Sequence, residues 1–238
     1  MPNLKTPPLT LSERLVIALD ASDMTAARHL VDTLHPLEPI FKIGYHSLFG
    51  GGLALAQDLA RQGVKVFLDA KLYDIPATVE GGTRALAAMG FWCMTAHAQA
   101  QNIAGAMAGA KGSDLRILGV TVLTSMDQTD LAADGLDRPV ADQVIIRAHQ
   151  AIQAGAHGLI ASPHEVTTLR EKFGPAPLII TPGVRSTGSQ AGDQVRVMTP
   201  GKAIQAGADA LVIGRPIIQA PDPLAAAKAI LDEISTAL

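Results

Sequence analysis

The chain has 238 residues and a formal net charge of −3, and 48% of its residues are hydrophobic while 3% are aromatic. This length suits one large α/β barrel or two smaller domains, and the acidic balance without a basic run argues against nucleic acid or an anionic membrane as a partner. The first residues lack the apolar core of a signal peptide, and no run reaches the roughly 18 apolar residues of a membrane span, so we expect a cytoplasmic protein.

After an N-terminal tail over residues 1–12, short apolar runs alternate with amphipathic segments. The apolar runs have the length of buried parallel strands, and the segments between them have the apolar spacing of helices. The predicted strands cover residues 15–20, 40–45, 64–71, 91–97, 115–123, 158–162, 178–184 and 210–214. The predicted helices cover residues 27–34, 53–61, 75–89, 103–110, 142–154, 165–173, 202–206 and 223–234, the last with Asp222 as its cap.

Eight strand-helix units without a boundary linker predict one domain over residues 1–238, an α/β fold of the (β/α)8 TIM-barrel type. An open doubly wound sheet stays possible, but it would lack a nucleotide fingerprint at its first turn. The run Gly50-Gly51-Gly52 does not provide one, because Leu55 stands where the G-x-G-x-x-G pattern requires glycine.

The third predicted strand presents two charged side chains to one side. Its period of two sends Asp69 and Lys71 to the same face, and Asp74 follows in the turn before the helix that Pro76 opens. Asp74 could instead cap that helix, and Asp69 with Lys71 could be a structural ion pair, although burying such charges costs several kcal/mol per ion, roughly. A strand end that carries this cost is more often part of a functional site than a purely structural feature.

In a barrel, all carboxyl ends of the strands face one mouth. The other polar residues that we expect there are Asp20, Lys42, Thr124, Arg185, Gly214 and Arg215. The polar loop over residues 184–199 is longer than most connections, which indicates a binding loop. Gln194 in this loop and Arg215 could hold a phosphate group, because barrels bind phosphate near the last two strands.

Several other chemistries are disfavoured by the sequence. Cys93 is the only cysteine, which excludes a disulfide framework and predicts a core position, and the seven histidines lack the spacing of a zinc site. His97 could be a base, but a histidine satisfied within the barrel is the favoured interpretation. Lys71 could form a Schiff base, yet the neighbouring carboxylates favour its ammonium form, which is a poor nucleophile and a good acid.

Taken together, these residues resemble one family, the orotidine 5′-phosphate decarboxylases. The resemblance rests on D-x-K-x-x-D-I-P-x-T at residues 69–78, on Asp20 and Lys42, on V-L-T-S at 122–125, P-G-V-R at 182–185, G-D-Q at 192–194 and V-I-G-R-P at 212–216. It extends along nearly the whole chain. The D-x-K-x-x-D element is shared by a wider superfamily, whereas the I-P-x-T continuation and the late arginines are more specific. Gln99-Ala100 departs from the family, where glycine is commoner.

The resemblance implies loss of CO2 from orotidine 5′-phosphate to give UMP, the last step of de novo pyrimidine nucleotide synthesis, without cofactor or metal. It implies a charged row of Lys42, Asp69 and Lys71, with Lys71 as the proton donor to C6 of the pyrimidine. Asp74 and Thr78 would reach in from the other subunit of a homodimer.

The same resemblance assigns the substrate-binding residues. Asp20 and Lys42 would hold the ribose hydroxyls, and Thr124 would lie near the base. The phosphate would be held by Arg185, Gln194, Gly214 and Arg215. Two alternatives stay open: a superfamily barrel that acts on a 3-keto sugar phosphate through bound Mg2+, and a barrel without catalytic activity that senses UMP.

Overall fold

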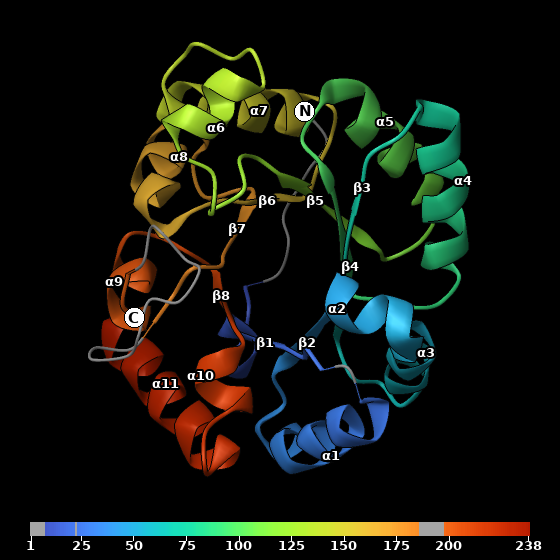
Figure 1. The fold of residues 1–238 in the computed structure, drawn as a ribbon, viewed down its shortest axis with the longest axis vertical. Coiled ribbons are helices and arrows are strands. Elements are labelled where there is room, and N and C mark those ends of the chain that lie inside the picture. Colours follow the sequence, from blue (N-terminus) through green and yellow to red (C-terminus); the bar gives the residue numbers. More distant parts are fainter. Residues whose placement is uncertain (1–7, 22, 186–197) are drawn as a thin grey trace.

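Eight parallel strands close into a barrel in sequential order, because β8 pairs with β1 as well as with β7 (Figure 1). The computed structural model describes residues 8–21, 23–185 and 198–238. The strands are β1 (Leu15–Ala18), β2 (Ile40–Ile43), β3 (Val66–Leu72), β4 (Cys93–His97), β5 (Arg116–Val120), β6 (Gly158–Ile160), β7 (Leu178–Thr181) and β8 (Ala210–Ile213). The predicted (β/α)8 barrel is thus confirmed, and the open sheet is excluded.

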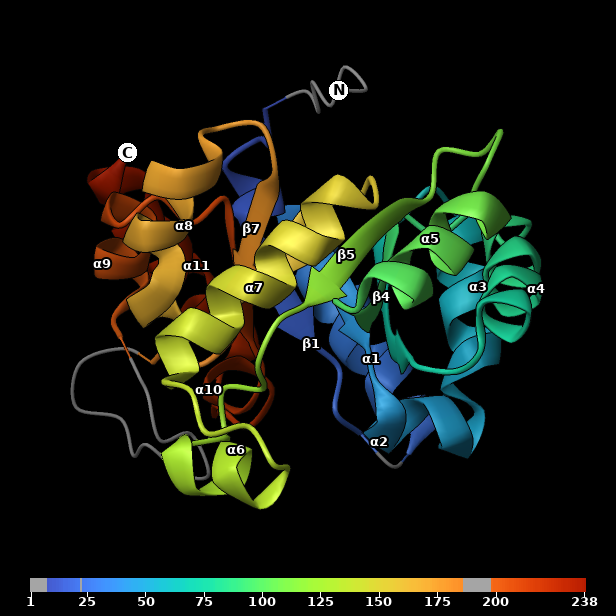
Figure 2. The same ribbon diagram turned by 90° about the horizontal axis from the view of Figure 1, so that it is seen from above.

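Among the described residues, eight helices, one after each strand, surround the barrel (Figure 1). They are α1 (Met24–Leu34), α3 (Leu53–Arg61), α4 (Pro76–Ala87), α5 (Ala100–Gly109), α7 (Val140–Gln153), α8 (Val166–Phe173), α9 (Pro200–Gln205) and α11 (Pro223–Ala237). In the described part of the chain, three short helices that the sequence did not predict lie around the end of the barrel where the strands finish, toward the bottom of Figure 2. These are α2 (Tyr45–Ser47), α6 (Gln128–Ala133) and α10 (Arg215–Ile218). Within the described residues, no helix is long and apolar enough to cross a membrane.

Alternation along the strands produces two separate apolar clusters. Outward residues such as Ile17, Phe41 and Leu68 pack against the helices, whereas Phe67 and Cys93 belong to a second cluster inside the barrel. Cys93 is fully buried, as predicted. The side chains inside the barrel are therefore apolar toward the amino ends of the strands.

The interior changes character toward the carboxyl ends of the strands. Two residues beyond the apolar Ile40, Phe67 and Cys93 come Lys42, Asp69 and Thr95, all of them buried. The strand period of two keeps these polar side chains on the inner side of the barrel. The barrel is thus closed by apolar packing at one end and carries polar groups at the other.

Helix caps account for several element boundaries. Asp222 caps α11 as predicted, because its carboxylate accepts a hydrogen bond from the Ala225 N–H at 2.9 Å. Helix α6 begins at a capping box in which Asp127 and Asp130 each accept from the other's backbone N–H. These two aspartates explain why a helix of only six residues forms beside the barrel mouth.

Candidate active site

A pocket of about 560 Å³ opens at the carboxyl ends of the strands. This volume is within the usual range for a small-molecule site. The pocket is lined by most of the residues that the sequence placed at the mouth, namely Asp20, Lys42, Asp69, Lys71, Thr124, Arg185, Gly214 and Arg215. These side chains come from six different strand ends, so only closure of the barrel brings them together.

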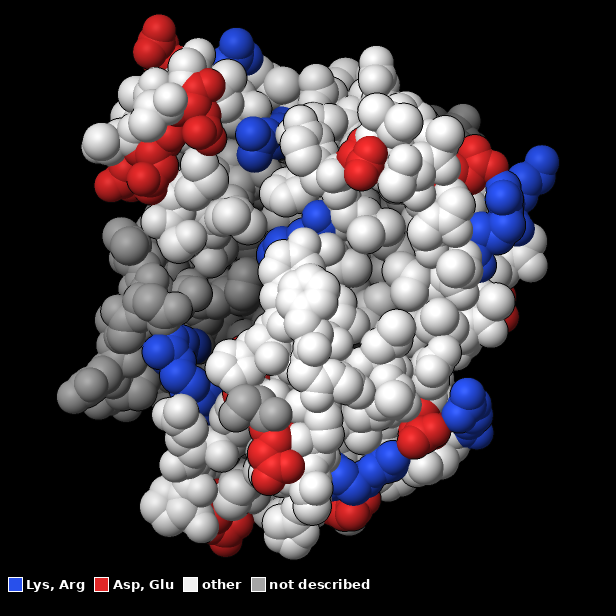
Figure 3. All heavy atoms as spheres, turned by 45° about the vertical axis from the view of Figure 1, so that its right-hand side comes forward, with Lys and Arg blue, Asp and Glu red and all other residues white. Residues whose placement is uncertain are grey.

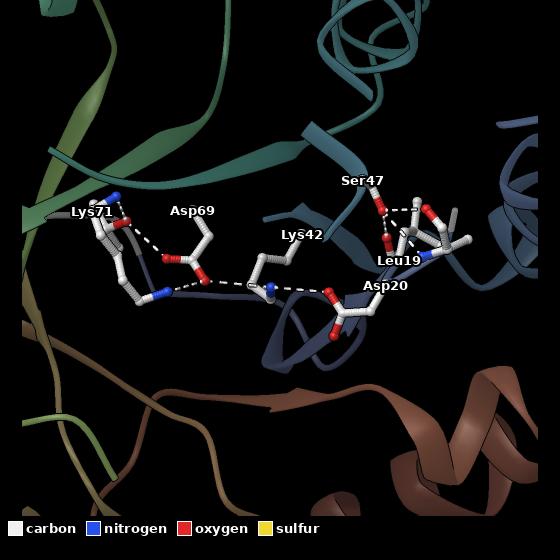
Figure 4. Close-up of polar contacts among 8 residues, drawn as sticks. Leu19, Asp20, Lys42, Ser47, Asp69 and Lys71 are labelled. Atoms are coloured by element: carbon white, nitrogen blue, oxygen red, sulfur yellow. Dashed lines mark hydrogen bonds and ion pairs between the residues drawn. The ribbon is translucent and has the colours of Figure 1, made fainter. Parts of the chain in front are cut away.

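Four charged side chains of alternating sign form a row along the wall of this pocket (Figure 4). Lys71 Nζ lies 2.8 Å from Asp69 Oδ2, and Lys42 Nζ lies 3.3 Å from the same oxygen. At the far end, Lys42 Nζ lies 3.6 Å from Asp20 Oδ1. The two inner charges, those of Lys42 and Asp69, therefore each have an opposite charge on both sides, and Asp20 and Lys71 are the two ends of the row.

Asp69 is the centre of the row, and its environment favours the charged form. Burial of this carboxyl raises its pKa, but the nearby ammonium groups of Lys42 and Lys71 and the hydroxyl of Thr95 lower it by more, so the net pKa is below the ordinary value. Only 9% of Asp69 is exposed. A buried carboxylate that stays ionised in this way forms a fixed negative charge in the wall of the pocket.

The backbone at Lys71 departs from the regular strand that the alternation predicted. Lys71 has a φ of 42°, in the left-handed region, and the pairing of β3 with β4 shifts register between Leu68 and Leu72. Such a conformation costs a non-glycine residue about 1–3 kcal/mol. The bulge still leaves the Lys71 side chain beside Asp69, so the expected proximity of these two side chains is observed.

Two polar residues that sequence reasoning missed support this segment. Thr95 Oγ1 lies 2.9 Å from Asp69 Oδ1 and accepts a hydrogen bond from the Lys71 N–H at 2.9 Å. Asn102 Nδ2 donates to the carbonyl oxygens of Leu72, at 2.6 Å, and His97, at 2.9 Å. Both residues are almost completely buried. Thr95 has the sequence signal of a polar residue within an apolar run, whereas Asn102 follows Gln101 and has no such signal.

Asp74 and Thr78 are exposed, and they do not line the pocket within the described part of the chain. The Asp74 N–H donates to Asn102 Oδ1 at 3.4 Å, and Asp74 Oδ1 accepts from the Ile75 N–H at 2.7 Å. Ile75 is the N-cap of α4 and makes no capping bond through its side chain. The alternative in which Asp74 caps this helix is therefore wrong, because the N-cap position is one residue later, at Ile75.

Ser47 fixes the backbone on either side of Asp20 (Figure 4). Its hydroxyl accepts from the Ala21 N–H at 3.1 Å and contacts the carbonyl oxygens of Leu19 and Ala21. Ser47 is 1% exposed and lies in α2, which directly follows the strand of Lys42. The short helix α2 thereby links the first two strand ends of the site.

Tyr45 is a further residue of the pocket wall that the sequence did not indicate. Its hydroxyl donates to the Ala70 carbonyl at 2.7 Å, and the centre of its ring lies 5.8 Å from Lys71 Nζ. This distance suits a cation–π contact. Burial, together with the negative charge of Asp69, raises the pKa of the Tyr45 hydroxyl, which keeps it protonated as a donor.

His97, considered as a base from the sequence, does not line the pocket. Its ring packs edge-on against Tyr73, with ring centres 5.4 Å apart. Burial lowers the pKa of His97, and the positive charges of Arg147 and Lys71 lower it further. A neutral histidine packed within the barrel wall agrees with the interpretation that the sequence favoured.

The predicted phosphate-side loop is described only at its two ends. Residues 186–197, including Gln194, lie outside the described residues. At the ends, the Arg185 N–H donates to the Met198 carbonyl at 3.0 Å, and Val184 and Met198 form a parallel bridge. Arg185 and Arg215 both line the pocket on this side. Two cationic side chains therefore line the pocket on the side where the sequence predicted phosphate binding.

A face with few charges adjoins the site (Figure 3). Large apolar side chains are also exposed near the strand ends of the site, with exposed fractions of 48% for Tyr45, which lines the pocket, 81% for Phe49, 67% for Tyr73 and 66% for Ile75. Tyr45 and Phe49 stack with ring centres 5.4 Å apart. Tyr73 and Ile75 flank Asp74 in the sequence. Exposed large apolar side chains of this kind are typical of an interaction surface.

The chain is similar over most of its length to proteins of one family. A sequence model described as "Orotidine 5'-phosphate decarboxylase / HUMPS family" matches residues 13–230. An orotidine 5′-phosphate decarboxylase of Methylobacterium sp. (strain 4-46) is 48% identical over 235 residues, which cover 98% of this chain and 100% of that protein. The protein of the same name from Afipia carboxidovorans is 47% identical over 230 residues, covering 97% and 98% of the two chains.

Two solved structures are also similar to this chain. The crystal structure of orotidine 5′-phosphate decarboxylase from Lactobacillus acidophilus superposes with a TM-score of 0.81 at 35% sequence identity, covering 93% of this chain and 99% of that one. An uncharacterized conserved protein from Geobacillus kaustophilus has a TM-score of 0.78 at 29% identity. Sequence and fold similarity therefore both extend over nearly the whole chain.

Proposed function

The chain belongs to the orotidine 5′-phosphate decarboxylase / HUMPS family, and on this basis we propose that it converts orotidine 5′-phosphate to UMP and CO2, the last step of de novo pyrimidine nucleotide synthesis. The proposal includes action in the cytoplasm as a single barrel domain, without a cofactor or metal. The observation that carries it is the row of Lys42, Asp69 and Lys71 in the wall of a pocket that also contains Arg215.

Loss of CO2 leaves an electron pair on C6 of the pyrimidine. Catalysis therefore needs a fixed cation beside that carbon in the transition state and a proton for it afterwards. Lys71 is suited to both tasks, because its ammonium is held 2.8 Å from Asp69 and its side chain lines the pocket. In this mechanism the C6 electron pair takes a proton from Lys71 Nζ, which leaves a neutral amine and UMP.

Asp69 and Lys42 prepare the site for this step. The ionised Asp69 orients the Lys71 ammonium, and Lys42 balances the negative charge from the other side. These groups are fixed before the substrate binds, so little reorganisation is needed when charge develops in the transition state. Asp69 would also face the carboxylate of the substrate, which adds a repulsion that departure of CO2 relieves.

The rest of the pocket would bind the parts of the substrate that do not react. Asp20 and Lys42 are proposed to hold the ribose hydroxyls, and Thr124 to contact the base. The phosphate would be held by Arg185, Gln194, Gly214 and Arg215. Binding energy from such remote groups can offset the cost of orienting and desolvating the reacting carbon, which one ammonium could not supply alone.

We further propose a homodimer in which Asp74 and Thr78 complete the site of the partner subunit. The support is the exposure of both residues beside the apolar side chains of Tyr73 and Ile75. An isolated chain would expose this apolar area to water at a free-energy cost of about 25 cal/mol per Å². Burial against a second copy would remove that cost and bring two further polar groups to the site.

The reaction is tested by following the ultraviolet absorbance of orotidine 5′-phosphate with purified protein in EDTA, beside a Lys71→Ala variant. We expect conversion to UMP in EDTA and its loss in the variant. No conversion by folded wild-type protein in the presence or absence of Mg2+ would refute the decarboxylase. Activity on a 3-keto sugar phosphate that EDTA abolishes would instead support the Mg2+-dependent alternative.

The shared site is tested by mixing two inactive variants, Lys71→Ala and Asp74→Ala. A heterodimer of these chains contains one site in which both residues are wild type, so about a quarter of the wild-type activity is the limit for random mixing. Restored activity supports the shared site. If both variants dimerise and exchange subunits but no activity returns, the site is contained within one chain.

The phosphate-binding role is tested with Arg215→Ala. We expect kcat/KM to fall by about 10- to 150-fold, because a charge-assisted hydrogen bond to phosphate contributes about 1.5–3 kcal/mol. Arg28→Ala is the matched control, since this arginine pairs with Asp58 on the outside of the barrel. Equal kinetics for the two variants would exclude Arg215 from phosphate binding.

A further inference from the structure

We propose that Thr95, which lies beneath the site and outside the pocket lining, is a positioning residue that fixes the side chain of Asp69 and the backbone of Lys71 together. The proposal rests on the decarboxylase function proposed above. Thr95 is fully buried and does not line the pocket, so it acts through its neighbours and not through contact with a ligand.

The hydrogen bonds of Thr95 leave its hydroxyl only one arrangement. A threonine hydroxyl has one proton to donate and lone pairs to accept with. The Lys71 N–H can only donate, so Thr95 Oγ1 accepts from it at 2.9 Å, and the hydroxyl proton is then directed at Asp69 Oδ1, also at 2.9 Å. One buried group thereby ties the main chain of Lys71 to the carboxylate that holds the Lys71 ammonium.

The register of the sheet explains why this support is needed. Leu68 pairs with Met94 and Leu72 pairs with Ala96, so residues 69–71 of β3 stand opposite the single residue Thr95 of β4. The regular ladder of backbone hydrogen bonds is interrupted over this bulge. The Lys71 N–H loses its ladder partner there, and the Thr95 side chain supplies the acceptor in its place.

The same contact stabilises an unfavourable backbone conformation. Lys71 has a positive φ of 42°, which persists only where surrounding groups hold it. Without the Thr95 acceptor, the Lys71 N–H would be a buried donor without a partner, and the bulge would relax to satisfy it. Relaxation of the bulge would move the Lys71 ammonium relative to Asp69.

Thr95 also completes the set of donors around Asp69. Lys42 and Lys71 both contact Oδ2, and Thr95 is the donor to Oδ1. The two carboxylate oxygens are thus held from opposite sides, which fixes the rotation of the carboxylate plane. A carboxylate held through Oδ2 alone could turn and carry Lys71 with it.

Thr95→Val tests the proposal, because valine keeps the branched shape and removes both hydrogen bonds. A displacement of about 1 Å at a reacting group can cost roughly 100-fold in rate, so we expect kcat to fall by about 10- to 100-fold. The KM for orotidine 5′-phosphate should change by less than about threefold, because the substitution leaves in place the pocket residues that are proposed to bind the ribose and the phosphate. Thr95→Ser should restore kcat to within about threefold of the wild type, since it restores the hydroxyl.

Thr121→Val is the matched control. Thr121 is also a fully buried threonine near the mouth, and its hydroxyl donates to the Ile160 carbonyl at 3.0 Å, away from the charged row. This variant should lose stability and keep the wild-type kcat. If valine prevents folding at position 95, Thr95→Ala removes the hydroxyl without placing a second methyl group against Asp69.

Two outcomes would overturn the proposal while leaving the function intact. One is a wild-type kcat in folded Thr95→Val, and the other is a Thr95→Ser variant as slow as Thr95→Val. If the wild type itself does not decarboxylate the substrate, the proposed function fails, and a crystal structure of Thr95→Val then decides the positioning role. An unchanged Lys71 backbone and an unchanged contact with Asp69 in that crystal would refute it.

Discussion

Replacement of Asp69 by asparagine, which has nearly the same shape, isolates the contribution of the negative charge at the centre of the row. Lys42 Nζ and Lys71 Nζ both lie within 3.3 Å of Asp69 Oδ2, so the two ammonium groups are at most about 6 Å apart. In Asp69→Asn they would face each other without the carboxylate between them. The variant therefore replaces the attraction of Asp69 for the two ammonium groups with a repulsion between those ammonium groups.

The size of this effect follows from the geometry. Two unit charges about 6 Å apart repel by about 3 kcal/mol at an effective dielectric constant of about 20. The loss of two charge-assisted contacts adds to this, whereas removal of a buried carboxylate recovers part of its desolvation cost. The Lys71 side chain is 27% exposed and can turn toward water, which limits the total. We expect the free energy of unfolding to fall by about 2–4 kcal/mol.

Urea denaturation at pH 7 measures this change, and Asp58→Asn is the control. Asp58 also contacts two cations, Arg28 and Arg61, but its side chain is 47% exposed. That variant should differ from the wild type by less than about 1 kcal/mol. If Asp69→Asn is as stable as the wild type, the ammonium groups do not depend on Asp69, and the proposed preorganisation of Lys71 is wrong.

Three further changes have defined outcomes. Asn102→Ala removes the bonds that hold the connection from β3 to α4, so the free energy of unfolding should fall by about 2–3 kcal/mol in urea, with a lower kcat. Tyr45→Phe keeps the ring beside Lys71 and should change kcat by less than about threefold, whereas Tyr45→Ala should reduce kcat by more. The pKa of His157 is lowered by burial and by Arg116, so the unfolded chain binds its proton first, and stability should fall as the pH drops below about 6.5. In His157→Asn, urea denaturation at pH 7.5 and 5.5 should show a smaller difference than in the wild type.

Each of these changes has an outcome that contradicts its reasoning. A fully active and stable Asn102→Ala would show that the connection from β3 to α4 keeps its conformation without the Asn102 side chain. Equal kinetics for the two Tyr45 variants would exclude the cation–π contact. His157 Nδ1 accepts from the Ile117 N–H at 3.0 Å, and asparagine can offer an oxygen at the same position without titrating. An unchanged pH dependence in His157→Asn would assign the acid sensitivity to another group.

The barrel could be predicted from the sequence because its signal is repeated eight times. Each strand is a short apolar run, most of the helices have an apolar stripe, and neither signal depends on contacts with distant parts of the chain. The same regularity located Asp69 and Lys71, since charged residues at the end of an apolar strand stand out. Closure of the barrel then brings Asp20 and Arg215 to the same pocket, although 195 positions separate them.

The details that position the site were not predictable in the same way. A strand period of two continues through Lys71, whereas the structure has a bulge there, because a register shift depends on the neighbouring strand. Thr95 appears in the sequence as one polar residue in an apolar strand, and its role depends on which residues lie opposite. The short helix α6 did have a local signal in Asp127 and Asp130, but six residues are too few for a clear apolar period.

Gly44 shows how a residue without any sequence signal can limit the site. Its φ of −114° is open to all residues, so backbone freedom does not explain a glycine here. A Cβ at this position would lie 2.9 Å from Lys42 Nζ and 3.7 Å from Asp69 Oδ2. Because the ammonium is the far end of a flexible chain, it can move away at little cost in stability. Gly44→Ala should therefore fold as well as the wild type and displace Lys42 from the row.

The expected result for Gly44→Ala is a kcat/KM lower by about 10- to 100-fold, with a free energy of unfolding within about 1 kcal/mol of the wild type. Gly201→Ala is the matched control, because a Cβ there would meet other atoms at 3.4 Å or more, which is ordinary contact. It should leave kcat/KM unchanged. If Gly44→Ala is as active as the control, the row tolerates displacement of Lys42, and its alternating charges are not a preorganised unit. If Gly44→Ala instead unfolds, the space beside Lys42 is needed for the fold and not for the placement of its charge.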